Sequence, residues 1–164
     1  MTRAYLALGG NLGDVAGEFA HVLQALASSD GVTIVAMSRV YRTPPWGVTD
    51  QPDFLNMAAA IETSLSARTL LELCLSIEAS SGRVRNERWG PRNIDIDVIA
   101  YGDEIIDEPD LTIPHPRAHE RAFVLAPLAE IAGDLTLAGR SVRAWLATVD
   151  ASGVRVDLEA TARV

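Results

Sequence analysis

The order of the predicted elements places this chain in the α+β class. Apolar alternation and helical periodicity between Ala4 and Tyr101 predict a strand, a helix, two strands, a second helix and a further strand. This βαββαβ order is typical of a ferredoxin-like two-layer sandwich, which is followed here by a C-terminal extension. Because that architecture hosts enzymes, ligand sensors and RNA-binding modules, the fold class alone does not select a function.

Length and charge limit the possible functions. The 164 residues suit one domain, 1–164, and no repeat or low-complexity segment interrupts them. A formal net charge of −8 argues against nucleic acid as a partner, since binding a phosphate backbone needs a broad basic face. No stretch approaches the roughly 18 apolar residues of a membrane span. We therefore expect a cytoplasmic monomer without a membrane or nucleic-acid partner.

Two residue types exclude particular chemistries. All 14 basic residues are arginines, so neither a P-loop lysine nor a lysine Schiff base can exist. Cys74 is the only cysteine, which excludes an internal disulfide and a cysteine zinc site. Its apolar surroundings predict a thiol in the core.

The first half of the chain predicts three strands and two helices. Ala4–Leu8 is expected to be a strand that leads through a Gly-rich turn into a helix capped by Asp14. That turn could cradle a phosphate, but without the rest of a dinucleotide fingerprint a tight strand-to-helix turn is favoured. Val32–Thr43 and Phe54–Thr63 are the second and third strands, and Ser66 caps the second helix.

The second half begins with the strand Asn93–Tyr101, whose alternation predicts Asp95, Asp97, Ile99 and Tyr101 on one face. The other predicted elements are short strands at Glu104–Ile106 and Leu111–Ile113, an apolar segment at Ala122–Ile131, a helix capped by Ser141, and a polar tail without recognisable chemistry.

The strand residues Asp95 and Asp97 predict a metal site. They are two positions apart, so their Cβ atoms are about 7 Å from each other and their charges repel. A divalent cation relieves that repulsion, and Mg²⁺ is typically held by one or two carboxylates and substrate phosphates. Four nearby arginines, whose guanidinium groups bind phosphate oxygens, are Arg83, Arg85, Arg88 and Arg92. The alternative is a solvated strand face beside a solvated loop, but their adjacency in an acidic chain favours a Mg-nucleotide site.

Four further residues are candidates for this site, each with a simpler alternative. Asn56 in an apolar strand would bind the amide edge of a heterocycle if buried, or would be hydrated at a strand end. Glu78 in the last helical turn suggests a cationic neighbour, or is merely exposed. His115, between two prolines and near Arg121, would bind phosphate or be structural. Trp46 is either the wall of a ligand pocket or a lid on the core.

A series of motifs resembles the 6-hydroxymethyl-7,8-dihydropterin pyrophosphokinase family, in the same order along the chain. The motifs are Tyr5-Leu-Ala-Leu-Gly, Tyr41-Arg-Thr-Pro-Pro, Gln51-Pro-Asp-Phe-Leu-Asn, Gly82-Arg-Val-Arg, Arg88-Trp-Gly-Pro-Arg, Asp95-Ile-Asp, Ile113-Pro-His-Pro and Arg121-Ala-Phe. The resemblance implies an ATP-dependent diphosphotransferase of folate biosynthesis, which moves the β,γ-pyrophosphate of ATP to the hydroxymethyl group of the pterin and releases AMP.

The resemblance also implies roles for particular residues. Two Mg²⁺ ions would be bound by Asp95 and Asp97, and the attack on the β-phosphorus would be in line, without a covalent intermediate. The catalytic residues would be Arg83, Arg92, Asp95 and Asp97. ATP would be bound by Arg83, Arg85, Trp89, Arg92, His115 and Arg121. The pterin would be bound by Thr43, Pro45, Trp46, Phe54, Asn56 and Phe123, with the two phenylalanines on either side of its ring, and Glu78 would support the site.

The chain departs from the family pattern at Asp110 and Pro116, where an arginine and a tyrosine can help to hold the nucleotide. Two other functions use the same residues. One is a non-catalytic module that senses a nucleotide or small metabolite. The other is a metal-dependent phosphohydrolase, which would release phosphate from ATP without a pterin.

Overall fold

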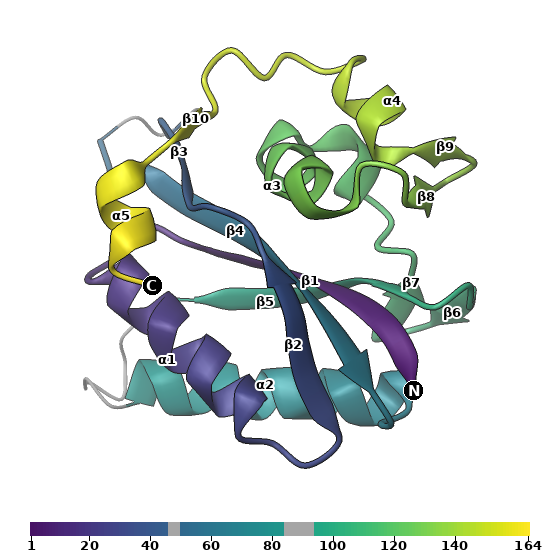
Figure 1. The fold of residues 1–164 in the computed structure, drawn as a ribbon. Helices are drawn as coiled ribbons and strands as arrows, with labels where there is room; N and C mark the ends of the chain where they lie inside the picture. Colours follow the sequence, from purple (N-terminus) through teal and green to yellow (C-terminus); the bar gives the residue numbers. More distant parts are fainter. Residues whose placement is uncertain (46–49, 84–93) are drawn as a thin grey trace.

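The computed structural model describes residues 1–45, 50–83 and 94–164, and these residues are arranged around one antiparallel sheet (Figure 1). Its strands follow the order β10-β3-β4-β1-β5, and β2 pairs with β4 on the same side as β3. The strands of the sheet are β1 (Thr2–Gly10), β2 (Val32–Met37), β3 (Tyr41–Thr43), β4 (Phe54–Thr63), β5 (Asp95–Tyr101) and β10 (Arg155–Val156).

Two long helices cover one face of this sheet, α1 (Val15–Ala27) and α2 (Ala67–Arg83). Both predicted caps are confirmed. The Asp14 side chain accepts a hydrogen bond from the Gly17 N–H at 3.2 Å, and the Ser66 hydroxyl accepts one from the Thr69 N–H at 3.1 Å. The fully buried side chains of the core beneath include Leu6, Leu8, Phe19, Leu26, Leu70 and Cys74.

The other face carries a second apolar cluster under α3 (Ala122–Ala132) and α4 (Val142–Leu146). The mixed α and β composition and the antiparallel sheet are confirmed. The prediction of two layers is incomplete, because the apolar segment at Ala122–Ile131 is a helix that packs on this face through Val124, Leu125 and Leu128. The remaining elements are short: β6 (Ile106–Glu108) and β7 (Leu111–Ile113), which pack against the first core, and η1 (Ala118–Glu120), β8 (Thr136–Leu137) and β9 (Arg140–Ser141).

The single strand predicted at Val32–Thr43 is wrong. Val32 pairs with Thr63 and Thr43 pairs with Phe54, so eleven residue steps (43 − 32) lie opposite nine (63 − 54). The two extra residues form bulges, one between Ile34 and Ala36 and one in 38–40, where β2 ends and β3 begins. A run of β-branched residues gives no sign of such a bulge.

The predicted alternation in β5 holds as far as Ile99, which lies on the face of Asp97 as predicted, and fails at Ala100 and Tyr101. The register with β1 shifts opposite Ile99, so Tyr101 lies in the first core while Ile99 and Ala100 lie in the second. The strand predicted at Glu104–Ile106 is also wrong, because the chain turns until β6 starts at Ile106.

The C-terminal residues are not merely a polar tail. They form β10, which adds a strand beside β3, and α5 (Leu158–Ala162), which lies next to the start of α1 (Figure 1). A two-residue strand carries no periodicity, so the sequence could not predict it. Within the ranges described, no helix is long and apolar enough to cross a membrane.

The buried thiol of Cys74 provides a test of this packing. Burial, and secondarily the charges of Glu78 and Asp97, raise the pKa of Cys74 to about 12. We expect the native protein to leave a thiol-reactive disulfide reagent unconsumed at pH 8 and the guanidinium-unfolded chain to consume one equivalent, since only the thiolate reacts. Rapid stoichiometric reaction of the native protein would contradict the packing of α2.

Candidate active site

Strand pairing brings the predicted site residues onto one face of the sheet. Gly9 of β1 lies opposite Asn56 of β4 on one side and opposite Asp95 of β5 on the other. Because neighbouring strands are about 4.8 Å apart, the backbones of Asn56 and Asp95 are about 10 Å apart across Gly9. The next row has Ala7 between Ala58 and Asp97. Gly9 and Ala7 have little or no side chain, so they leave space between the polar side chains on either side. We call this face of the sheet, which carries Asn56, Asp95 and Asp97, the site face.

Two buried polar atoms on the site face have no hydrogen-bond partner in the described part of the chain. Asn56 is 8% exposed, so the alternative of a hydrated strand end is wrong. Among the described residues, the buried Asn56 Oδ1 and Thr43 Oγ1 make no hydrogen bond. Leaving such an atom unsatisfied costs about 1–3 kcal/mol each. A ligand with hydrogen-bonding groups along one edge would satisfy both atoms.

Gly9 provides the room for the Asn56 side chain. A Cβ atom on Gly9 would lie 2.5 Å from Asn56 Nδ2, closer than real Cβ contacts allow. The predicted tight strand-to-helix turn is confirmed at residues 11–14, but it starts later than predicted, because β1 continues to Gly10 and Gly9 is a strand residue. A glycine inside a strand is itself a signal of close approach, and sequence reasoning missed it.

The strand segment that carries Asp95 and Asp97 is hydrogen-bonded to helix α2. Asp95 is exposed and Asp97 half-buried, while Glu78 is only 5% exposed. The prediction that Glu78 lies in the last helical turn is wrong, because α2 continues to Arg83. The Ile96 N–H donates to Glu78 Oε2 at 2.6 Å, so the alternative of an exposed Glu78 is wrong. This contact fixes the residue between the two aspartates.

The oxygen atoms of Asp95 and Asp97 suit a hard cation. In the part of the chain that the structure describes, no group of three or more His, Cys, Asp or Glu residues could enclose a metal ion. A cation bound here would therefore need further oxygen atoms from a bound substrate, as Mg²⁺ does when substrate phosphates complete its coordination. The residues present fit that ion.

A cleft of about 280 Å³ adjoins Asp97. Its lining includes Asp97, Thr112, His115, Pro116 and Asp110. Both positions that depart from the family pattern, Asp110 and Pro116, thus lie at this cleft. The Asp110 carboxylate forms an ion pair with Arg68 at 2.6 Å. The hydrogen bond from Arg68 lowers the pKa of Asp110, and the positive charge of Arg68 balances the charge of the carboxylate.

His115 presents one proton donor to this cleft. The Arg117 N–H donates to His115 Nδ1 at 3.2 Å, so the neutral imidazole carries its proton on Nε2. Burial lowers the pKa of His115; Asp97 opposes the shift, and Arg121 adds to it. A neutral donor beside arginines is suited to a phosphate oxygen.

Of the predicted pterin ligands, Thr43, Pro45, Phe54 and Phe123 are half-buried. Phe54 lies opposite Thr43, and the Arg121 guanidinium carbon is 5.8 Å from the centre of the Phe123 ring. A ring held between Phe54 and Phe123 stays a prediction. The predicted residues that lie outside the described part of the structure are Trp46, Arg85, Arg88, Trp89, Arg92 and the side chain of Arg83.

Comparison with known proteins gives consistent matches. The sequence profile of the 7,8-dihydro-6-hydroxymethylpterin-pyrophosphokinase (HPPK) family matches residues 5–133. The 2-amino-4-hydroxy-6-hydroxymethyldihydropteridine pyrophosphokinase of Methylorubrum extorquens is 56% identical over 154 residues, covering 94% of this chain and 98% of the relative. The enzyme of the same name from Bacillus subtilis is 44% identical over 153 residues, covering 93% of this chain and 89% of its own.

Solved structures match in fold. The crystal structure of Plasmodium falciparum HPPK-DHPS has a TM-score of 0.70 over 90% of this chain at 15% identity. This chain spans 43% of that longer chain. At this identity, the likeness shows the fold alone.

The lowered pKa of His115 predicts how the free protein responds to pH. We expect the imidazole to titrate below the usual value of about 6.5 in an NMR titration without metal or nucleotide. As the pH falls, His115 is therefore protonated in the unfolded chain before it is protonated in the folded protein. Its contribution to the free energy of unfolding is complete above about pH 6.5 and is lost as the pH falls from there through the pKa of the folded state.

Replacing a neighbour of His115 should move its pKa in a known direction. Arg121→Gln removes a repelling charge and should raise it, whereas Asp97→Asn should lower it further. A titration midpoint at or above 6.5 in the unmodified protein would contradict the burial of this side chain.

Proposed function

Because this chain belongs to the HPPK family, whose members are pyrophosphokinases of folate biosynthesis that use ATP, we propose that it moves the β,γ-pyrophosphate of ATP to the hydroxymethyl group of 6-hydroxymethyl-7,8-dihydropterin and releases AMP. The observation that carries this proposal is the pair of unsatisfied buried atoms, Asn56 Oδ1 and Thr43 Oγ1, on the same sheet face as Asp95 and Asp97.

The pterin would lie at the Asn56 side of the site face. Its amino and amide groups offer donors along one edge, and these match the two acceptor atoms that the protein leaves unpaired. Phe54 and Phe123 would stack on its ring, and Pro45 and Trp46 would border it. A phosphohydrolase or a general nucleotide sensor has no use for this second polar patch, which favours the pterin transferase.

ATP would lie at the Asp95 side, in the cleft beside Asp97 and His115. His115 Nε2–H and Arg121 would bind phosphate oxygens from one direction. From the other direction the ATP phosphates would be bound by Arg83, Arg85, Arg92 and Trp89. Two Mg²⁺ ions held by Asp95 and Asp97 would neutralise phosphate charge when they are bound.

The reaction requires positioning rather than a protein nucleophile. The hydroxymethyl oxygen forms a bond to the β-phosphorus in line, the bond from that phosphorus to the α,β-bridging oxygen breaks, and AMP leaves with that oxygen. The hydroxyl proton is lost during the attack, and Asp95 or Asp97 can accept it. The site face orients the pterin alcohol, while the arginines stabilise charge that develops in the transition state.

We extend the proposal to the whole protein as a cytoplasmic monomer with one domain, 1–164, that binds small molecules and no nucleic acid. The order β5-β1-β4 followed by β2 and β3 supports the assignment of the core to the ferredoxin-like class.

Removing one carboxylate of the pair should stop the reaction and leave the fold. We expect Asp95→Asn and Asp97→Asn to lower kcat at least about a hundredfold, the scale seen when an electrostatic stabiliser of a transition state is lost. Pterin binding in calorimetry and the circular dichroism spectrum should not change. Asp103→Asn, in the exposed turn after β5, is the matched control. Near-normal turnover in a folded Asp97→Asn protein would refute the metal assignment.

Filling the space beside Asn56 should weaken pterin binding specifically. In Gly9→Ala the new Cβ must displace the Asn56 amide, because it would lie 2.5 Å from Nδ2. We expect the Kd for the pterin to rise about tenfold or more, which corresponds to one lost hydrogen bond of about 1.4 kcal/mol. Gly153→Ala is the control, since its Cβ would lie at an ordinary 3.7 Å from Pro44. Equal pterin affinity in both variants would contradict the role of Asn56.

A further inference from the structure

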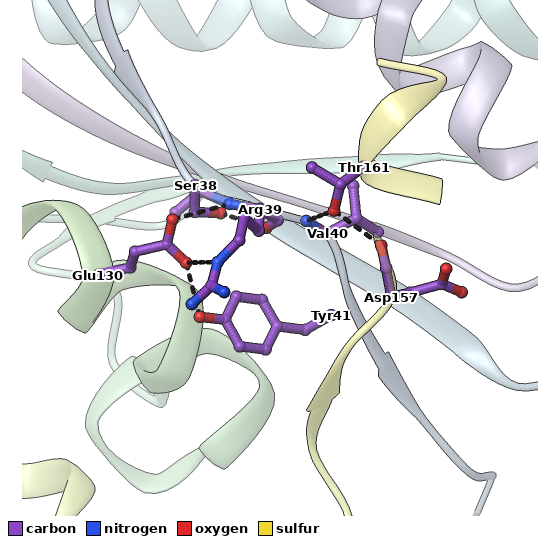
Figure 2. A network of polar contacts seen from close by, with 8 residues as sticks. Ser38, Arg39, Val40, Tyr41, Glu130, Asp157 and Thr161 are labelled. Atoms are coloured by element: carbon purple, nitrogen blue, oxygen red, sulfur yellow. Dashed lines mark hydrogen bonds and ion pairs between the residues drawn. The ribbon is translucent and has the colours of Figure 1, made fainter. Parts of the chain in front are cut away.

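The bulge at residues 38–40 is held from the site face by one carboxylate of α3. Glu130 accepts three hydrogen bonds there (Figure 2): from the Arg39 N–H at 3.1 Å, from Arg39 Nε–H at 3.1 Å and from the Tyr41 hydroxyl at 2.7 Å. Its side chain is 24% exposed, and burial favours the neutral form. The donors outweigh that effect and lower the pKa of Glu130, so the carboxylate is charged at neutral pH.

The C-terminal residues hold the same segment from another side. The Val40 N–H donates to Thr161 Oγ1 at 2.9 Å, and the Asp157 N–H donates to the Val40 carbonyl at 2.8 Å. The Thr161 hydroxyl in turn donates to the Asp157 carbonyl at 2.7 Å. The Asp157 carboxylate also pairs with Arg42 of β3 at 2.6 Å. Both backbone groups of Val40 are therefore satisfied by the end of the chain.

These contacts involve one of the two bulges that set where β3 lies along β4. On the register at the start of β2, where Val32 pairs with Thr63, residue 43 would lie opposite residue 52. The bulges move Thr43 two residues, so that it pairs with Phe54 beside Asn56. β3 itself has three residues and is followed by two prolines, which have no N–H to donate. Its own pairing is short, so contacts outside the strand must hold this register.

We propose that Glu130 and Thr161 are positioning residues for pterin recognition: they hold the bulge at 38–40 and thereby keep the Thr43 hydroxyl opposite Phe54, in the row of the site face next to that of Asn56. The inference rests on the proposed function, and it assigns the last ten residues of the chain a part in substrate specificity. It applies to the pterin alone, because Asp95, Asp97 and His115 are carried by β5 and the segment after β7, which these contacts do not touch.

The test is a set of matched hydroxyl variants. Thr161→Val keeps the shape of the side chain and removes the oxygen that accepts from Val40, whereas Thr161→Ser keeps that oxygen. Thr148→Val is the control, because it removes an exposed hydroxyl that donates to the Trp145 carbonyl of its own turn. For each protein we would measure KM for the pterin and for ATP, kcat, the Kd of the pterin without ATP, and hydrogen exchange at the Val40 amide.

We expect Thr161→Val to expose the Val40 amide to exchange and to raise both KM and Kd for the pterin about tenfold, or about 1.4 kcal/mol, while KM for ATP stays the same. Thr161→Ser and Thr148→Val should behave as the unmodified protein. If Thr161→Val does not fold, Glu130→Gln tests the same register from the α3 side and should raise the same two constants.

An unchanged pterin Kd with a freely exchanging Val40 amide would overturn the inference, since the contact would be lost without effect on the site. A parallel rise in KM for ATP would overturn it too, because it would indicate general loosening. Absence of pterin binding by the unmodified protein would refute the proposed function itself, so the two failures are distinguishable.

Discussion

The antiparallel pairing of β1 with β4 and β5 is the constraint on which the site depends. It places Asn56 and Asp95 in one row with Gly9 between them, and Ala58 and Asp97 in the next row with Ala7 between them. Because this register is fixed by backbone hydrogen bonds, Asn56, which we propose binds the pterin, and Asp95, which we propose holds the metal, lie about two strand spacings apart before any ligand binds. A shift of one residue would turn every one of these side chains to the opposite face.

The opposite face stabilises this arrangement. Leu6 and Leu8 of β1 and Ile96 of β5 are buried against α1 and α2, and full burial of such a side chain contributes about 1.5–3 kcal/mol. That stabilisation can offset the unsatisfied Asn56 and Thr43 atoms, which cost about 1–3 kcal/mol each. Glu78 of α2 connects the two faces, because its buried carboxylate accepts a hydrogen bond from the Ile96 N–H, between the two aspartates.

The sequence predicts the parts of this structure that have a periodic or local signal. The helix caps at Asp14 and Ser66, the strand Phe54–Thr63 and the shared face of Asp95 and Asp97 all follow from spacing and residue type. The bulges between β2 and β3 do not follow from spacing, because they depend on how the chain pairs with β4. Nor does the strand β10, whose two residues pair with β3 from more than a hundred positions away. The roles of Glu130 and Thr161 were missed for the same reason: both bond residues distant in sequence.

The central claim is that one sheet face holds a pterin alcohol against the phosphates of ATP. The most direct measurement is AMP formation from Mg-ATP with 6-hydroxymethyl-7,8-dihydropterin, compared with the 6-methyl compound that has the same ring and no hydroxyl. The account predicts AMP only with the hydroxymethyl compound, one molecule for each pterin diphosphate formed. Equal AMP release with the 6-methyl compound, or phosphate release from ATP alone, would contradict it and favour a hydrolase.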